Sequence, residues 1–237
     1  MTKEIRLLWE GGDFFAVDKS PGTLVIPGRG EGEGPSLREL LEARLGHKVY
    51  VVHRLDRDTS GVLLFARTAA AHRELSVAFE RGLVRKLYRA LVAGNLVSEE
   101  RVEVALAPAR RGRMRPARGE EGKGAVTLVR SLEAFQGATL VEAEPLTGRS
   151  HQIRVHLQVL GHPLLVDPQY ARARALTAAD LGGVGDRPVL VRTPLHAAVL
   201  EVPRLPGIGP FRIESPLPPD MEEALQLLRA GGGPRVS

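Results

Sequence analysis

The chain lacks cysteine and is poor in aromatic residues, and both absences limit what it can be. Among its 237 residues there is no Cys, and Phe, Trp and Tyr together make up 4%. Without thiols the protein has no disulfide framework, no cysteine nucleophile, and no zinc finger or iron–sulfur cluster. No apolar run approaches the ~18–20 residues of a membrane span, and the N-terminus is too acidic for a signal peptide. We therefore expect a cytoplasmic protein without membrane contacts.

Lysine is also scarce, so arginine carries most of the positive charge. The 33 basic residues exceed the 28 acidic ones by five, and 28 of the 33 are Arg. Arginine binds phosphate groups in a bidentate manner and stacks on bases, so this bias favours a nucleic-acid partner. A GC-rich coding sequence explains the same bias equally well.

The hydrophobic pattern predicts an α+β protein with a largely antiparallel sheet. Strands are expected at residues 5–9, 14–18, 23–26, 49–52, 62–66, 85–92, 126–135, 138–146, 195–202 and 211–214. Helices are expected to start at the capping residues Ser36, Thr68, Ser150 and Asp220. Residues 108–124 are rich in Arg and without apolar periodicity, which predicts a long exposed loop. Residues 171–187 are expected to form a polar connection.

The densest cluster of polar residues lies between two predicted strands, at His53–Gly61. Its Asp56 stands between Arg54 and Arg57, and nearby cations favour the charged form of a carboxyl group. A fixed, ionised carboxylate suits a nucleophile or a base. A turn whose side chains bind their own backbone explains this cluster equally well.

A second cluster surrounds the predicted start of the third helix. If that helix begins at Ser150, His151 and Arg154 share one face, and Arg154 is able to pair with a carboxylate across a site. Arg149, beside the helix N-terminus, suits a phosphate group. His151 and His156 are five residues apart and point away from each other on a helix, so we expect no metal site.

A third candidate lies on a predicted strand. Lys86 and Tyr88 lie on one face of the strand at 85–92, where the tyrosine ring is able to stack on a base, although an ordinary half-exposed strand tyrosine explains it too. Ser60 lacks the G-x-S-x-G context of a hydrolase nucleophile.

Three motifs, in this order and spacing, resemble the RluA-type family of RNA pseudouridine synthases. They are HRLDRDTSGVLLFA from His53, KLYRALVAG from Lys86 and TGRSHQIRVHL from Thr147. Weaker similarity occurs at FFAVDKSPG, GHPLLVDPQY and LHAAVLEV. The resemblance implies that Asp56 is the catalytic aspartate, that Tyr88 packs on the target base, and that Arg154 pairs with Asp56.

The resemblance also implies the architecture and the partners. We expect one catalytic domain over residues 1–230, built on a long, mainly antiparallel mixed sheet with helices and RNA-gripping loops. We expect no separate N-terminal RNA-binding domain and a frayed tail at 231–237. The implied partner is structured RNA, either ribosomal or transfer RNA. The basic segment Arg110–Arg118 is then a candidate RNA-binding loop, through Arg111, Arg113 and Arg115. The implied state is a monomer that uses no cofactor or metal.

The implied reaction isomerises uridine to pseudouridine after the base is flipped out of its stack. Whether Asp56 attacks covalently or abstracts a proton stays open, as does the choice between Arg54 and Arg57 as the residue that assists flipping. Two other functions remain as alternatives: an RNA-binding or ribosome-assembly protein without the chemistry, and a hydrolase of nucleotides or nucleosides.

Overall fold

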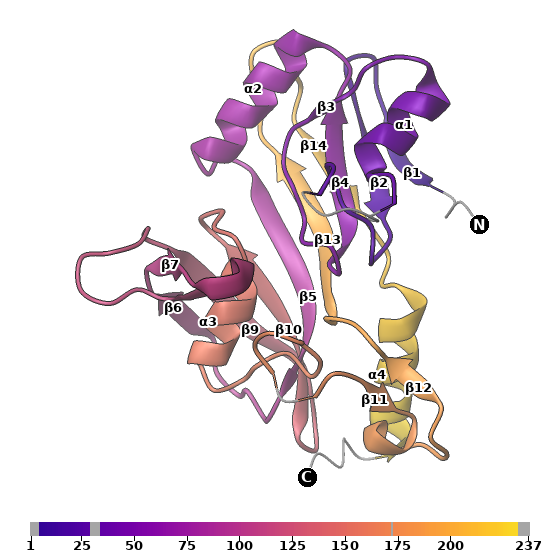
Figure 1. The fold of residues 1–237 in the computed structure, drawn as a ribbon, viewed down its shortest axis with the longest axis vertical. Coiled ribbons are helices and arrows are strands. Elements are labelled where there is room, and N and C mark those ends of the chain that lie inside the picture. The colour runs from indigo at the N-terminus through magenta and orange to yellow at the C-terminus, as the bar shows by residue number, and fades with distance from the viewer. Residues whose placement is uncertain (1–4, 29–33, 172, 232–237) are drawn as a thin grey trace. The chain divides into compact units, whose positions relative to one another are not determined.

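The computed structural model of the chain describes residues 5–28, 34–171 and 173–231 and divides into two compact units (Figure 1). The first unit holds the residues up to Lys86 together with Ala197–Pro216. The second holds Leu87–His196 and the residues from Leu217 on. The single catalytic domain over residues 1–230 stays a prediction. The last helix extends to Gly231, and the other residues of the tail predicted as frayed lie outside the described ranges.

Among the residues that the structure describes, ten strands belong to the main sheet. In the first unit neighbouring strands follow the order β1-β2-β4-β13, with β3 also on β4 and β14 on β13; in the second unit the order is β5-β10-β9-β6. The pairings β1–β2, β2–β4, β5–β10, β10–β9 and β9–β6 are antiparallel. Together with the α-helices α1 to α4 of the described ranges, this confirms the predicted α+β fold around a large, mainly antiparallel sheet.

In the first unit, α1 and α2 lie beside the strands (Figure 1). Ser36 and Glu39 form the predicted capping box of α1, and the Thr68 side chain accepts from the Ala71 N–H at the start of α2. The apolar faces of α2 and the strands make one core, with Leu64 and Leu75 fully buried in it. The elements are β1 (Arg6–Glu10), β2 (Phe14–Lys19), α1 (Leu37–Leu45), β3 (Tyr50–Val51), β4 (Ser60–Ala66), α2 (Ala69–Glu80), β13 (Leu195–Val202) and β14 (Phe211–Glu214).

In the second unit, α3 packs on the strands through Ile153 and Leu157, and α4 packs with β11 and β12 around Leu181 and Leu225. The β9–β10 hairpin has its predicted turn at Gln136 and Gly137. The elements are β5 (Arg85–Ala93), β6 (Glu100–Glu103), β7 (Leu106–Pro108), β8 (Met114–Pro116), β9 (Val126–Phe135), β10 (Ala138–Pro145), α3 (Gln152–Val159), β11 (Leu176–Thr177), β12 (Pro188–Leu190) and α4 (Pro219–Gly231); short 3₁₀ turns occupy Arg110–Gly112 and Ala179–Leu181. Strands β5 and β13 each begin in one unit and end in the other.

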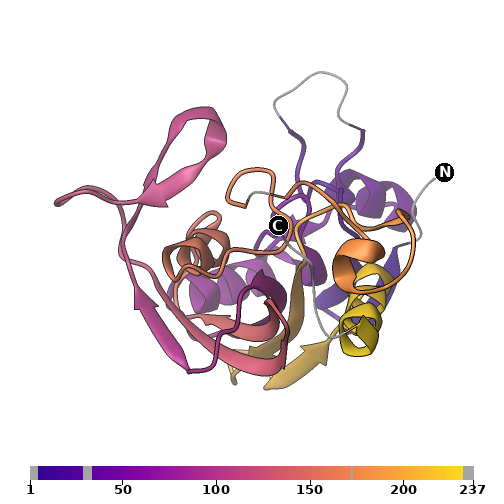
Figure 2. The ribbon, with the colours of Figure 1, turned by 90° about the horizontal axis from the view of Figure 1, so that it is seen from below.

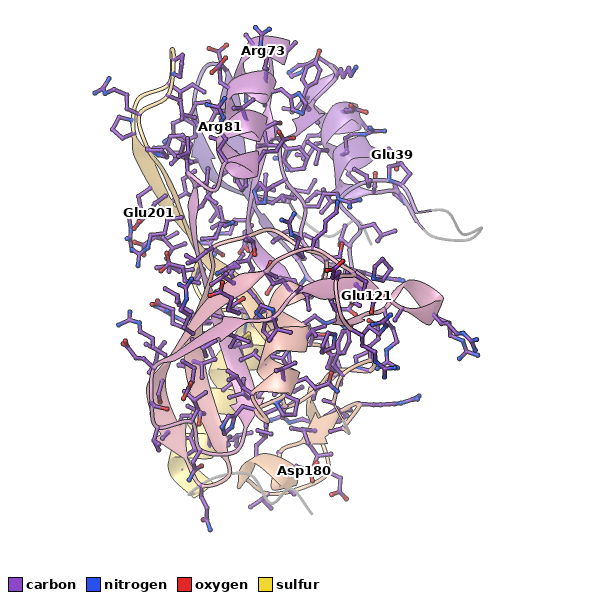
Figure 3. The ribbon with its side chains drawn as sticks, turned by 90° about the vertical axis from the view of Figure 1, so that its left-hand side faces the viewer. Glu39, Arg73, Arg81, Glu121, Asp180 and Glu201 are labelled. Atoms are coloured by element: carbon purple, nitrogen blue, oxygen red, sulfur yellow. The ribbon has the colours of Figure 1, made fainter. Side chains whose placement is uncertain are left out.

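Two predicted elements of the first half of the chain differ in the structure. The strand predicted at 23–26 is absent, because the carbonyl groups of Leu24 and Val25 accept hydrogen bonds from the N–H groups of Leu37 and Arg38 at the start of α1. The loop predicted at 108–124 contains strand β8, which pairs with β7. Figure 2 shows this hairpin as an arm that projects from the second unit, and Figure 3 labels Glu121, which follows β8 in the chain.

Two predictions for the second half are also wrong. The third helix is not capped by Ser150: its N-cap is His151 in the left-handed conformation (φ 53°), and Gln152 accepts the Arg149 N–H through its side-chain oxygen at 3.0 Å. The expected polar connection at 171–187 instead holds strand β11 and a 3₁₀ turn. Their residues Leu176 and Leu181 are buried against α4.

Gly61, directly after the turn that carries Asp56, has no room for a side chain. Its φ is +112°, and a Cβ there lies 2.2 Å from the carbonyl oxygen of Ala197 on β13. We expect Gly61→Ala to lower the free energy of unfolding by about 2–4 kcal/mol, since it combines a left-handed residue with overpacking. Gly46→Ala is the matched control, because Gly46 also has a positive φ (+72°) but open space around it. If urea denaturation shows that the two variants lose the same free energy of unfolding, this account is contradicted.

Candidate active site

Asp56 lies on a short turn between β3 and β4. Its carbonyl oxygen accepts the N–H of Thr59 at 3.2 Å, which closes the turn. Asp56 and Asp58 are half-buried, Arg54 and Arg57 are exposed, and Leu55 between them is buried in the protein. The turn therefore places one carboxylate and two arginines at the surface of the first unit, while the buried side chain of Leu55 anchors it to the protein.

Lys19, at the end of β2, fixes the Asp56 turn. The side chain is 1% exposed, and its Nζ donates to the carbonyl oxygens of Arg57 at 2.7 Å, Thr59 at 2.8 Å and Ser20 at 3.2 Å. An ammonium group has three hydrogens to donate, and these three carbonyls match them. Lys19 was missed as a site residue, although its segment FFAVDKSPG had been noted for similarity.

His53 begins the same segment and supports the sheet. Its ring stacks on Phe79 with the ring centroids 4.4 Å apart, and its Nε2 accepts the N–H of Leu64 at 3.1 Å. Burial, and next the positive charge of Lys86, lower the pKa of His53 to about 3. At neutral pH His53 is therefore an uncharged hydrogen-bond acceptor.

The lowered pKa of His53 predicts a loss of stability in acid. Unfolded, the imidazole takes up a proton near pH 6.5, whereas in the folded protein it does so only near pH 3. The unfolded state thus binds more protons between these values, so stability falls as the pH falls, by up to about 1.4 kcal/mol per pH unit. In urea denaturation between pH 6 and 4, we expect a shallower dependence for His53→Gln, which keeps an acceptor for Leu64. If the free energy of unfolding changes with pH equally in the wild type and in His53→Gln, the prediction is contradicted.

Arg154 lies on α3 and has a carboxylate partner in the second unit. It is 7% exposed, and its Nε and Nη2 donate to the two carboxylate oxygens of Asp167 at 2.7 and 2.8 Å. Asp167 is fully buried and also accepts the N–H groups of Gln169 at 2.9 Å and Tyr170 at 3.2 Å. Such a bidentate pair fixes the plane of the guanidinium group. Asp167 was missed as a site residue because its segment had been noted only for similarity.

Tyr170 connects Arg154 with His151. The Arg154 guanidinium lies 4.9 Å from the centre of the Tyr170 ring, and the His151 Nδ1 lies 2.8 Å from the Tyr170 hydroxyl oxygen. Burial raises the pKa of Tyr170, which keeps its hydroxyl protonated. His151 is held in a left-handed conformation that is costly for such a residue, and strain of this kind is concentrated at functional sites.

The other predicted site residues are distributed as follows. Tyr88 and Lys86 on β5 are half-buried, and Tyr88 packs against a core of the second unit. Arg149 is exposed and donates from Nε to the Gly124 carbonyl oxygen at 3.1 Å. The β7–β8 hairpin carries Arg111, Arg113 and Arg115; Arg111 and Arg113 are exposed, and Arg115 pairs with Glu121 at 2.6 and 3.0 Å.

The predicted site residues thus fall into two groups. Asp56 belongs to the first unit with Arg54, Arg57 and Lys86. Arg154 belongs to the second unit with Tyr88. Around Tyr170 the second unit brings His151, Arg154 and Arg113 together. The pairing of Asp56 with Arg154 stays a prediction.

The comparison with protein families gives the decisive observation. The sequence model described as RNA pseudouridylate synthase matches residues 13–159, a range that contains Asp56, Tyr88 and Arg154. The chain belongs to this family. The resemblance to RluA-type pseudouridine synthases is thereby confirmed, and with it the prediction of an isomerase.

Curated relatives of this RNA pseudouridylate synthase family are similar along most of the chain. Ribosomal large subunit pseudouridine synthase D of Nitrosomonas europaea is 38% identical over 95% of this chain and 65% of its own length. Ribosomal large subunit pseudouridine synthase C of Escherichia coli is 38% identical over 94% of this chain and 70% of its own length. The chain therefore spans about two thirds of the length of these relatives.

Two solved human structures share the fold of this family. The one titled RNA pseudouridylate synthase domain containing 4 has a TM-score of 0.75 at 24% identity and covers 94% of this chain and 93% of its own. The one titled RNA pseudouridylate synthase domain containing 1 has a TM-score of 0.69 at 25% identity and covers 99% of this chain and 98% of its own. The predicted fold is therefore confirmed by structure as well as by sequence.

The remaining expectations concern membrane spans, metal ligands, cellular location, oligomeric state and cofactors. In the part of the chain that the structure describes, no helix has the length and apolarity needed to cross a membrane. Nor do three His, Asp or Glu side chains gather among these residues as ligands for a metal ion. A cytoplasmic location, a monomeric state and a reaction without cofactors stay predictions.

Proposed function

We propose that the protein isomerises uridine to pseudouridine in the RNA of the large ribosomal subunit. The observation that carries this proposal is the 38% identity, over 94–95% of the chain, to enzymes named for the large ribosomal subunit. The RNA pseudouridylate synthase match over residues 13–159 supports the reaction. The rigid Asp56 turn supports the assignment of the reacting carboxylate.

The reaction rearranges bonds without net oxidation. The N1–C1′ bond of uridine breaks, the uracil turns, and C5 bonds to C1′; C5 then loses its hydrogen to the solvent as a proton, and N1 gains one. We propose that Asp56 acts in this sequence, either by attack on the sugar or by taking a proton. Both roles need a carboxylate held in place, and the hydrogen bonds of Lys19 to the Arg57 and Thr59 carbonyls fix the backbone of the turn that carries it.

Arg154 and Tyr88 are proposed to complete the catalytic set. We propose that Arg154 faces Asp56 and holds it, since its guanidinium is oriented by the buried Asp167. Tyr88 is proposed to stack on the uracil, where an aromatic ring contributes about 1–3 kcal/mol to holding a base. Arg54 or Arg57, both exposed beside Asp56, is proposed to assist base flipping, which costs a few kcal/mol.

The RNA backbone is proposed to contact the basic residues around these two groups. They are Lys86, Arg149, His151, Arg111, Arg113 and Arg115. Arginines that bind phosphate release counterions, so affinity is expected to fall as salt rises. Arg115 is expected to contribute less than Arg111 and Arg113, because Glu121 already pairs with its guanidinium.

The experiment that tests the substrate is pseudouridine mapping in cells. Total RNA is compared between the source strain, a strain that lacks this gene, and the same strain carrying the gene again. We expect at least one pseudouridine of large-subunit ribosomal RNA to disappear and return. Loss of a site in transfer RNA instead refutes the substrate, and an unchanged map in both RNA classes refutes the activity.

A further inference from the structure

One buried tyrosine in the second unit touches both the basic hairpin and the element that carries Arg154. Tyr170 is 5% exposed. Its hydroxyl oxygen accepts the N–H of Met114, on hairpin strand β8, at 2.8 Å. The same oxygen lies 2.8 Å from Nδ1 of His151, the N-cap of α3. The described contacts of this hydroxyl therefore join the hairpin to α3.

The hydroxyl group of Tyr170 bonds to both elements at once. Its oxygen accepts the N–H of Met114 and lies within hydrogen-bond distance of Nδ1 of His151. A phenol hydroxyl both donates and accepts, so the contact with His151 forms with either tautomer of the imidazole. Loss of the hydroxyl group therefore removes both contacts.

The ring of Tyr170 makes the same connection through two arginines. The guanidinium of Arg113, on the hairpin, lies 5.3 Å from the ring centre, and that of Arg154 lies 4.9 Å from it. Both distances are within the range of cation–π attraction. Arg113 also donates to the carbonyl oxygen of Gln169, the residue before Tyr170. The candidate phosphate-binding arm and the candidate catalytic arginine therefore share one aromatic support.

Apolar packing around the ring is limited to a small cluster. Buried Leu106, Ala125 and Val155 surround Tyr170, with Met114 packed against them. Leu106 and Met114 belong to the two hairpin strands, and Val155 follows Arg154 on α3. This apolar cluster and the hydroxyl hydrogen bonds both attach the hairpin to α3, and a substitution that removes only the hydroxyl group leaves the apolar part in place.

We propose that Tyr170 is a positioning residue that couples the β7–β8 hairpin to α3, so that RNA held by the hairpin is aligned with Arg154. The inference rests on the proposed function for its RNA partner. Its structural half, the attachment of the hairpin by the Tyr170 hydroxyl, is independent of that function. The coupling predicts that the hairpin arginines contribute to RNA binding only while Tyr170 holds the hairpin.

The first test measures the attachment in the free protein. In Tyr170→Phe the ring and its packing stay and only the hydroxyl is lost, so the protein is expected to fold. We expect hydrogen exchange of the Met114 amide to become at least about 10-fold faster, while exchange in the middle of α3 stays unchanged. Tyr50→Phe is the matched control, because Tyr50 lies on β3 of the first unit.

The second test is a double-mutant cycle on RNA binding. Arg111 lies in the turn of the hairpin, so Arg111→Gln removes a phosphate contact without touching Tyr170. In the wild-type background we expect Kd for the substrate RNA to rise about 3-fold or more. In the Tyr170→Phe background we expect the same substitution to change Kd less than about 1.5-fold. Tyr170→Phe alone is expected to raise KM about 5-fold and to change kcat less than about 2-fold.

Each outcome decides between the alternatives. Faster Met114 exchange together with a non-additive cycle supports the coupling. Unchanged Met114 exchange, or effects of Arg111→Gln that are equal in both backgrounds, overturns it. A wild-type protein that forms no pseudouridine refutes the proposed function instead, and the exchange and Kd measurements then still decide the role of Tyr170.

Discussion

Asp56→Asn is expected to lower the rate of pseudouridine formation at least about 10³-fold, which is within the range for a positioned acid–base group. The substitution keeps the size of the side chain and removes its charge and its basicity. The Asp56 backbone takes part in the turn through its carbonyl oxygen, which the substitution leaves in place. The rate is measured as tritium released from RNA labelled at C5 of uridine.

Asp58→Asn is the matched control for Asp56. Asp58 lies two residues further along the same turn and is half-buried as well. It is expected to serve the turn, so its substitution is expected to change the rate less than about 10-fold. Tritium release by Asp56→Asn at the wild-type rate contradicts the assignment, and a larger loss in Asp58→Asn than in Asp56→Asn moves the assignment to Asp58.

Arg154→Met is expected to destabilise the protein by about 3–5 kcal/mol and to abolish activity. The loss of stability follows because the substitution leaves the buried carboxylate of Asp167 without its bidentate partner. In the double variant Arg154→Met with Asp167→Leu, no buried charge is left alone. Part of the stability is therefore expected to return, whereas the activity is not. Urea denaturation and tritium release are measured on the same samples.

Arg192→Met provides the comparison for Arg154. Arg192 is also a buried arginine of the second unit, bound through Nε and Nη2 to both carboxylate oxygens of Asp220 at 2.7 and 2.9 Å. Its substitution is expected to lower stability while each folded molecule keeps its activity. If Arg154→Met keeps its activity after correction for the folded fraction, Arg154 has only a structural role.

Local sequence patterns predicted the parts of the fold that depend on local interactions. The capping box at Ser36 and Glu39, the cap at Thr68 and the turn at Gly137 each involve residues close in sequence. A continuous apolar run likewise identified β4, whose residues are all buried. These features need no knowledge of distant partners.

Features that depend on distant partners were not predictable in the same way. The helix α3 starts later than predicted. The side chain of Gln152 accepts the N–H of Arg149 in the preceding loop and also donates to Thr127 of β9, 25 residues away. The support of the Asp56 turn comes from Lys19, about 40 residues earlier. These contacts exist only in the folded chain, so spacing in the sequence does not reveal them.

The candidate site shows the same division. The motifs around Asp56, Tyr88 and Arg154 identified the family from sequence alone, and the family match confirmed it. Asp167, the partner of Arg154 in the second unit, lies in the loop after α3. A match of sequence motifs does not show that these two side chains are in contact. The role of Tyr170 likewise needs the positions of Met114 and Arg113, which no pattern predicts.

The central claim is most directly tested by the balance of the reaction in vitro. The purified protein is incubated with a transcript of large-subunit ribosomal RNA that carries tritium at C5 of its uridines, and the RNA is then digested to nucleosides. We predict that pseudouridine forms in equal amount to the released tritium and that no free uracil accumulates. Free uracil without pseudouridine indicates a hydrolase, and an RNA that is bound but unchanged indicates a binding protein; either result contradicts the account.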